Sequence, residues 1–195
     1  MIVGLVATIA FLLMVIFVTG DLGLTNYLIS AAEVRAFKNK NTAADKIGLR
    51  LLYNGMIISS RFQLPLASKC LNHYCYNNGD TLYFDPKPLL VNKEVQKAIL
   101  SRKKGIVFKS GPEVNKNFHF VKTTDKDLYF AFDVLHIRQT KHKIIFYDTY
   151  YFQPLERRTR PLFEIGKIKF RLNDGLIKVA YPEAKPFVAY AEVNK

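Results

Sequence analysis

The first 34 residues contain no lysine or arginine, although the whole chain carries 29 basic residues against 16 acidic ones. Secretory signals normally begin with a basic segment, so its absence argues against a cleaved signal peptide. The stretch from Ile2 to Thr19 is uncharged and has only two polar residues, Thr8 and Thr19. As a helix it would be about 27 Å long, close to the ~30 Å hydrocarbon core of a bilayer. We therefore expect a retained single-pass transmembrane anchor over residues 1–20.

The orientation of such an anchor is not decided by the sequence. Arg35, Lys38 and Lys40 follow the apolar run, and the positive-inside rule alone would place the rest of the chain in the cytoplasm. The pair of closely spaced cysteines, and the lipid substrate that the resemblance described below implies, instead favour the periplasmic side of a bacterial inner membrane. Both orientations remain open at this point.

Acidic residues are scarce enough to leave a formal net charge of +13. Such an excess implies an anionic partner, for which membrane lipid is the first expectation in a tethered domain. We expect no nucleic acid partner, because the basic residues are dispersed along the chain and no recognised reading motif accompanies them.

Cysteine is also rare: the chain has two, Cys70 and Cys75, with His73 between them. Two thiols so close together could form a local disulfide in an oxidising compartment, or could remain free. A metal site is the third alternative, although three ligands within six residues and no second cluster do not match structural zinc spacing.

The polar and apolar pattern predicts a helical region over residues 21–62 and a β-rich domain over residues 63–195. In the first, Asn41 or Thr42 is positioned to cap a helix. Its apolar face is expected to consist of Ala44, Ile47, Leu51, Leu52 and Ile58.

In the second region, strand-like runs alternate with turns, apart from one expected helix over residues 92–102. The expected strands span residues 106–109, 118–122, 129–138, 143–152, 165–172 and 187–193. The two longest are joined around Gln139 and should pair in antiparallel fashion. The expected fold class is therefore α+β: a transmembrane helix, a helical segment, and an antiparallel β-rich domain forming a curved sheet or partly open barrel.

Most of the chemistry is expected at the end of the strand over residues 143–152. Alternation places Asp148 and Tyr150 on one face, and an arginine cluster, Arg157, Arg158 and Arg160, follows the turn at Pro154. A carboxylate, a phenol and guanidinium groups suit metal or phosphate binding. The structural alternative is an amphipathic edge strand whose aspartate pairs with an arginine beyond the turn. His119, His136 and His142 are further acid–base candidates, each more simply explained as a strand or turn residue.

The stretch Asp148-Thr-Tyr150-Tyr151-Phe-Gln-Pro154, with Arg157-Arg158 after it, resembles the catalytic domain of colicin M-type bacteriocins. The resemblance covers about a third of the chain, from Tyr129 to Val193, and includes Gly166-Lys-Ile168, Gly175-Leu176 and Lys185-Pro186-Phe187. It implies a β-rich, partly open barrel that hydrolyses the polyprenyl-pyrophosphate linkage of lipid II in the periplasm with a divalent cation such as Mg²⁺.

The resemblance also implies roles for individual residues. Asp148, Tyr150 and Arg158 match catalytic positions, with Asp148 as metal ligand, whereas Tyr151 and Arg157 replace the family's second aspartate and its histidine. Tyr151, Arg157 and Arg160 would then contact substrate. The replacements remove a carboxylate and a titratable base, because arginine stays protonated near neutral pH.

Two functions follow from the sequence. In the first, a membrane-anchored envelope domain binds or cleaves a polyprenyl-pyrophosphate lipid with an altered active site. In the second, the domain is a non-catalytic, membrane-tethered module that binds anionic lipid or a partner protein. The sequence leaves open whether the chain is an enzyme.

Overall fold

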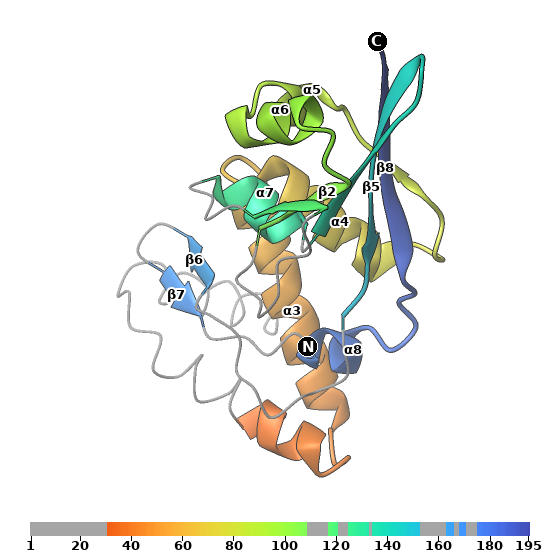
Figure 1. Ribbon diagram of the computed structural model, residues 1–195. Coiled ribbons are helices and arrows are strands. Elements are labelled where there is room, and N and C mark those ends of the chain that lie inside the picture. Colours follow the sequence, from red (N-terminus) through yellow and green to blue (C-terminus); the bar gives the residue numbers. More distant parts are fainter. Residues whose placement is uncertain are drawn as a thin grey trace. The chain divides into compact units, whose positions relative to one another are not determined.

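The computed structural model describes residues 31–108, 117–120, 125–132, 134–152, 163–165, 168–170 and 175–195 (Figure 1). The chain divides into two compact units, each built from two separate segments. Residues 1–51 and 153–182 form the first unit, and residues 52–152 and 183–195 form the second. The long helix α3 (Ala43–Ser60) begins in the first unit and ends in the second.

The second unit contains a six-stranded sheet with the strand order β1-β8-β5-β4-β2-β3. Its three central pairs, β8 with β5, β5 with β4 and β4 with β2, are antiparallel. Both outer pairs, β1 with β8 and β2 with β3, are parallel. The strands are β1 (Leu82–Tyr83), β2 (Gly105–Val107), β3 (Phe118–Phe120), β4 (Val134–Gln139), β5 (Lys143–Tyr150) and β8 (Phe187–Asn194).

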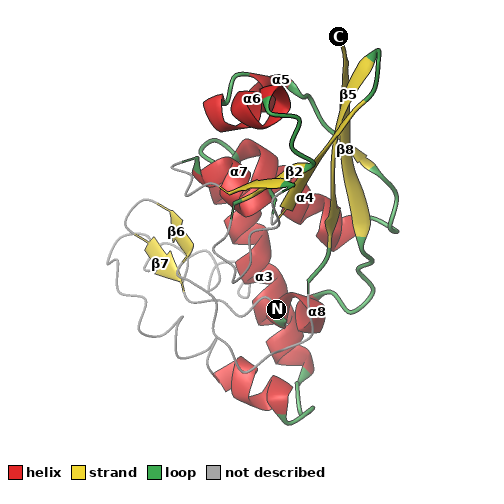
Figure 2. Ribbon diagram, viewed as in Figure 1, coloured by secondary structure: helices red, strands yellow, loops and turns green. Residues whose placement is uncertain are grey.

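Helices of the second unit are interleaved with these strands along the chain (Figure 2). They are α4 (Pro65–Tyr76), α5 (Lys87–Leu90), α6 (Lys93–Leu100) and α7 (Lys126–Ala131). In Figure 1, α6 and α7 lie on one side of β5 and β8. The core of the unit forms between these helices and the sheet face that they cover.

Strand alternation separates the two faces of this sheet. The face toward the helices carries buried side chains on every central strand, among them Ile106, Leu135, Phe146 and Ala189, each 0% exposed. The neighbours of these residues along each strand point to the opposite face. Side chains there are half-buried or exposed, as at Tyr147, Tyr190 and Tyr83. We call this second side the open face.

The first unit contains a helical segment at residues 31–37, the first part of α3, the antiparallel pair β6 (Phe163–Ile165) and β7 (Ile168–Phe170), and α8 (Leu176–Ala180). Arg50 of α3 donates a hydrogen bond from Nε to the carbonyl oxygen of Ala180 at 2.6 Å. Its guanidinium carbon also lies 5.1 Å from the ring centroid of Tyr181. These contacts attach α8 to α3.

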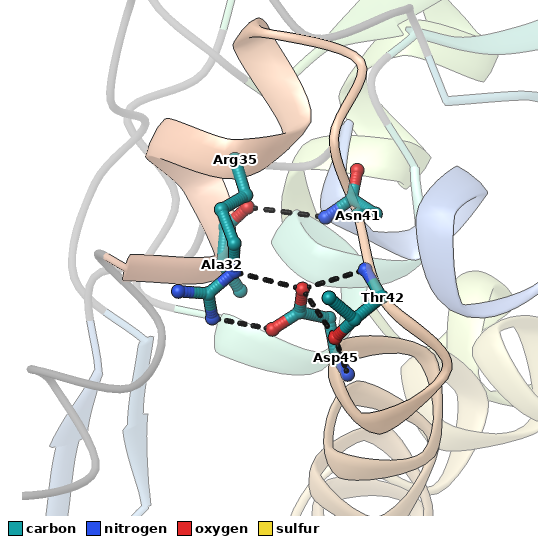
Figure 3. A network of polar contacts seen from close by, with 5 residues as sticks. All are labelled: Ala32, Arg35, Asn41, Thr42 and Asp45. Carbon is teal, nitrogen blue, oxygen red and sulfur yellow. Dashed lines mark hydrogen bonds and ion pairs between the residues drawn. The ribbon is translucent and has the colours of Figure 1, made fainter.

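The start of α3 is a capping box closed by an ion pair (Figure 3). The Thr42 hydroxyl accepts the Asp45 backbone N–H at 3.2 Å, and the Asp45 carboxylate accepts the Thr42 backbone N–H at 2.9 Å. Arg35 contacts both carboxylate oxygens of Asp45, with Nε 2.8 Å from one of them. The Arg35 guanidinium holds the pKa of Asp45 well below its ordinary value. The predicted cap at Thr42 is confirmed.

The apolar face predicted for this helix is wrong. Ile47, Leu51 and Ile58 are 60%, 41% and 71% exposed. The buried residues of α3 are instead Asp45, Leu49, Tyr53, Met56 and Ser60. They also recur at helical spacing, so the sequence contained two candidate stripes. The exposed stripe is the richer of the two in branched aliphatic residues, because its positions include Ile47, Leu51 and Ile58.

The expected antiparallel β-rich domain is likewise wrong, because the sheet has parallel outer pairs and four helices alternate with its strands. Residues 65–76 form helix α4, and α7 occupies the first part of the strand expected over residues 129–138. Asp125 starts α7 by accepting the Leu128 backbone N–H at 3.1 Å. Strands β1 and β3 have only two and three residues, too few for alternation to indicate that their pairing is parallel.

The transmembrane helix in the expected fold class is corrected as well. Among the helices that the structure describes, none is long and apolar enough to cross a membrane. The expected anchor over residues 1–20 lies outside the described residues.

Helix α4 explains the state of the cysteines. Cys70 and Cys75 are not joined by a disulfide, and they are 0% and 3% exposed. Residues five positions apart on one helix are separated by about 7.5 Å along its axis and by about 140° around it, which prevents a disulfide without unwinding. Burial raises the pKa of the Cys70 thiol above its ordinary value, with smaller contributions from Asp127 and Asp148.

This arrangement predicts that neither thiol reacts with iodoacetamide in the folded protein, because both are buried and Cys70 stays protonated. Adding denaturant alone should expose both thiols to alkylation, and mass spectrometry would count the modified cysteines. If alkylation of the denatured protein also required a reducing agent, the free-thiol state would be wrong.

Candidate binding surface

The residues predicted to form the site begin on β5, on the face toward the helices. Asp148 is 6% exposed, and it pairs in register with Ala189 of β8. Tyr150 lies two positions further along on the same face and pairs with Phe187. The predicted shared face of Asp148 and Tyr150 is therefore confirmed. Arg157, Arg158 and Arg160 lie outside the described residues.

Tyr150 belongs to an aromatic cluster between β5, β8 and α4. Its ring stacks on Phe187 with centroids 5.1 Å apart and meets Phe152 edge-on at 5.4 Å. Tyr74 of α4 completes the cluster at 4.8 Å from Phe152, and burial raises the pKa of its hydroxyl. The neighbouring Tyr151 is 56% exposed. Within the described residues, this cluster packs the end of the strand against α4.

On the open face, the six strands align one residue each in a continuous row. Register pairs Tyr83 with Tyr190, Tyr190 with Tyr147, and Tyr147 with His136. His136 then pairs with Gly105, and Gly105 with Phe118. Five of these six positions carry aromatic rings. We call Tyr83, Tyr190, Tyr147, His136 and Phe118 the aromatic row.

The rings of the aromatic row contact one another across the strands in two groups, Phe118 with His136 and Tyr147, and Tyr190 with Tyr83. His136 and Tyr147 are stacked with centroids 4.9 Å apart. Phe118 meets His136 edge-on at 5.7 Å, and Tyr83 meets Tyr190 edge-on at 5.8 Å. Burial lowers the pKa of His136 below its ordinary value of 6.5, so its imidazole is neutral at pH 7.

Gly105 makes the contact between Phe118 and His136 sterically possible. A Cβ atom on Gly105 would lie 2.6 Å from the Phe118 Cε1 atom and 2.6 Å from the Leu135 carbonyl oxygen. Both distances are too short for any side chain. The Phe118 ring therefore occupies the space above Gly105, and the absence of a side chain there keeps the row continuous.

A cleft of about 640 Å³ lies at one end of the row, lined by Phe118, His136, Tyr147 and nine further residues. Six of its twelve lining residues are basic, and none of the twelve is acidic. The basic residues are Arg102, Lys103, Lys104, Arg138, Lys141 and Lys195, and the cleft is named the basic cleft after them.

Three structural features bring these cations together. Arg102, Lys103 and Lys104 connect α6 to β2, and Arg138 and Lys141 belong to β4 and the hairpin turn after it. Lys195 follows β8, and its backbone N–H donates to the His142 carbonyl oxygen at 2.9 Å. Gln139 donates to the Ile99 carbonyl oxygen at 2.8 Å, which joins the hairpin to α6. The surface therefore combines neutral aromatic rings with a concentrated positive charge.

Sequence reasoning missed this surface, although one signal for it was present. Alternation in β5 places Tyr147 opposite the face of Asp148, and the antiparallel hairpin brings His136 beside it. The basic cleft could not be anticipated in the same way, because its basic residues are separated by up to 93 positions in the chain, from Arg102 to Lys195. Of the remaining histidine candidates, His119 lies 2.8 Å from the Glu94 carboxylate, and His142 lies in the hairpin turn.

Comparison with known proteins adds no family to this picture. No protein-family model, no curated protein and no solved structure matches the chain.

Proposed function

We propose that this domain is a binding module for a phosphate-bearing anion, which it holds in the basic cleft. The observation that carries this proposal is the gathering of six basic side chains around one cleft with no acidic lining residue. Like charges held together repel one another, so a bound anion relieves an electrostatic cost that the free protein bears. A volume of about 640 Å³ also suits a ligand of ordinary metabolite size.

Phosphate matches the types of cation at the cleft. Arg102 and Arg138 carry planar guanidinium groups, which bind two phosphate oxygens in parallel. The lysines add compact positive charges that strengthen binding without demanding one geometry. A carboxylate ligand would use the guanidinium groups equally well, but it would leave most of the positive charge unneutralised.

Arg102 occupies a backbone conformation that favours glycine, with φ of +49°. It follows the C-terminus of α6 in a Schellman motif, in which the Arg102 N–H donates to Ile99 and the Lys103 N–H donates to Ala98. The left-handed conformation costs about 1 kcal/mol for a residue with a side chain. An arginine at this position is therefore better explained by its charge than by its fit to the helix end.

This conflict predicts that Arg102→Gly weakens binding and leaves stability nearly unchanged. The free energy of unfolding should stay within about 0.5 kcal/mol of wild type, because relief of the left-handed strain offsets the flexibility of glycine. Affinity for inorganic tripolyphosphate, measured by isothermal titration calorimetry on the full chain, should fall severalfold. Asn39→Gly is the matched control, since Asn39 has φ of +53° at another helix end and does not line the cleft. Unchanged affinity in Arg102→Gly would contradict the proposal.

A second candidate function is the binding or cleavage of a polyprenyl-pyrophosphate lipid at the end of β5. It is supported by the resemblance of the motif and by the shared face of Asp148 and Tyr150. A divalent cation would supply charge neutralisation at the phosphates. The fit of such an ion is poor, because the described residues contain no group of three or more His, Cys, Asp and Glu suited to a metal. Tyr151 also stands where the motif has a carboxylate.

The test of this second function uses lipid II in detergent micelles, with Mg²⁺ and with EDTA. If it holds, wild-type protein releases the polyprenyl product, and Asp148→Asn does not, because the substitution keeps the shape and removes the charge. Asp80→Asn is the control, since the Asp80 side chain is 71% exposed and lies outside the motif. No product from folded wild-type protein would reject hydrolysis and leave binding at the basic cleft unaffected.

A further inference from the structure

We infer that the aromatic row and the basic cleft together bind single-stranded nucleic acid, with bases stacked on the rings and phosphates held by the cations. This inference rests on the proposed function, because it takes the basic cleft as the phosphate site. It adds the chemical class of the ligand, for which the aromatic row supplies the evidence.

The row and the cleft are one continuous surface. Phe118, His136 and Tyr147 belong to the row and also line the cleft. A ligand whose phosphates reach Arg138 or Lys141 therefore meets aromatic rings directly beside them. Nucleic acid is the common phosphate polymer that carries a flat aromatic group on every repeating unit, and stacking on protein rings is its usual mode of single-strand binding.

The length of the aromatic row favours an oligonucleotide over a single nucleotide as the ligand. Six adjacent strands span five intervals of about 4.8 Å, which makes about 24 Å from Phe118 to Tyr83. Tyr83, at the end distant from the cleft, is 69% exposed. A mononucleotide in the cleft would reach only the rings that line it, whereas an oligonucleotide would also contact Tyr190 and Tyr83.

The open face suits unpaired bases and not a duplex. Tyr83 is 69% exposed, so bases that are already unpaired can stack on its ring, and the other rings of the row border the same open face. In a duplex the bases are stacked inside, and their edges are reached through grooves by a helix or a narrow ribbon. The surface described here has neither shape.

A lipid surface is less compatible with the same residues. Lys143 and Glu192 form an ion pair of 2.7 Å on the open face, and the Tyr190 hydroxyl donates to Glu192 at 2.8 Å. These charges stand beside the aromatic row. Headgroups could use the cations of the cleft, but the row would then have to approach a hydrocarbon phase that excludes charged pairs.

The fold removes one of the two reasons for expecting no nucleic acid partner. The basic residues are dispersed in the sequence, but the structure brings six of them to one cleft. The parallel edge pairing of β3 completes the surface, because it places Phe118 over Gly105.

The experiment compares two fluorescein-labelled oligomers of about 12 units, oligo-dT and an abasic oligomer with the same number of phosphates, by fluorescence anisotropy with the full chain. Oligo-dT should bind at least about tenfold more tightly, because only it can stack. Tyr83→Ala should reduce this preference and leave affinity for the abasic oligomer nearly unchanged, because Tyr83 belongs to the aromatic row and does not line the cleft. The control is Tyr76→Ala, which removes a tyrosine that is 59% exposed and outside the row.

The outcomes separate the inference from the function on which it rests. Equal affinity for the two oligomers, with loss of both in Arg102→Gly, would overturn the nucleic acid inference and keep anion binding. No affinity for either oligomer or for tripolyphosphate would overturn both. If ATP bound as tightly as oligo-dT, the ligand would be a mononucleotide and the oligonucleotide inference would be wrong. If the protein bound anionic phosphatidylglycerol vesicles and showed no preference for oligo-dT, the ligand would be a lipid surface and the inference would also be wrong.

Discussion

Replacing Gly105 with alanine should lower the free energy of unfolding by about 3 kcal/mol. The new methyl group would lie 2.6 Å from the Leu135 carbonyl oxygen and 2.6 Å from the Phe118 ring. The ring could rotate away, but the carbonyl belongs to the paired strands β2 and β4 and cannot move without separating them. Urea denaturation followed by circular dichroism would measure the loss.

Gly55→Ala provides the matched control for this substitution. A Cβ atom at Gly55 meets nothing within 4 Å, and the residue lies within helix α3. Alanine is favoured over glycine in a helix by up to about 1 kcal/mol, so this variant should be at least as stable as wild type. The packing described for Gly105 would be incorrect if both variants unfolded at the same urea concentration.

The second large effect is expected from removing half of the positive charge of the basic cleft. In the variant Lys104→Gln/Arg138→Gln/Lys141→Gln, three of six cations are lost. Binding of single-stranded phosphate chains weakens with salt by a slope of about −0.7 per neutralised phosphate. The logarithmic slope against salt concentration should therefore change from about −4 toward about −2, and affinity at low salt should fall at least about tenfold. Anisotropy titrations of the abasic oligomer over a series of NaCl concentrations would measure both quantities.

A control variant with the same change in net charge, but with its substitutions away from the cleft, shows whether binding depends on the charge at the cleft or on the overall charge of the protein. Lys87, Lys93 and Lys126 are exposed lysines of α5, α6 and α7 that do not line the cleft. Their simultaneous replacement by glutamine should leave the salt slope nearly unchanged. If both triple variants lost affinity equally, overall charge and not the basic cleft would explain the binding.

Local signals in the sequence were sufficient for several elements of the fold. Alternation identified β5 and its antiparallel partner β4, and the Asn92 side chain caps α6 by accepting the backbone N–H groups of Glu94 and Val95. Thr42 caps α3 in the same manner. Each of these signals lies within a few residues of the structure that it determines.

Helix α4 shows why other elements could not be predicted. Its N-terminus has no cap from its own neighbours, and Leu64 provides no side-chain hydrogen bond there. Instead, the Asp127 carboxylate of α7 accepts the backbone N–H groups of Leu66 and Ala67 at 3.1 and 2.8 Å. A cap supplied from 60 positions away leaves no local pattern.

The candidate surface was missed for a related reason. Pattern reasoning indicates which residues share a face of one strand, as it did for Asp148 and Tyr150, but it does not give the register between distant strands. Phe118 and Tyr83 join the aromatic row through parallel edge pairs of three and two residues. Lys195 approaches the cleft only after β8 has paired with β5. Tertiary pairing therefore creates a surface that no segment contains alone.

The most direct test of the proposed function is to locate phosphate binding on the protein by two-dimensional ¹H–¹⁵N NMR during titration with inorganic tripolyphosphate. Binding at the basic cleft predicts that the largest chemical shift changes occur at the amides of Arg102, Lys104, Arg138, Lys141 and Lys195. The amides of Asp148 and Tyr150 should change less than these, since the side chains of both residues lie on the other face of β5. Shift changes concentrated at Asp148 and Tyr150, with none at the cleft, would contradict the proposed function.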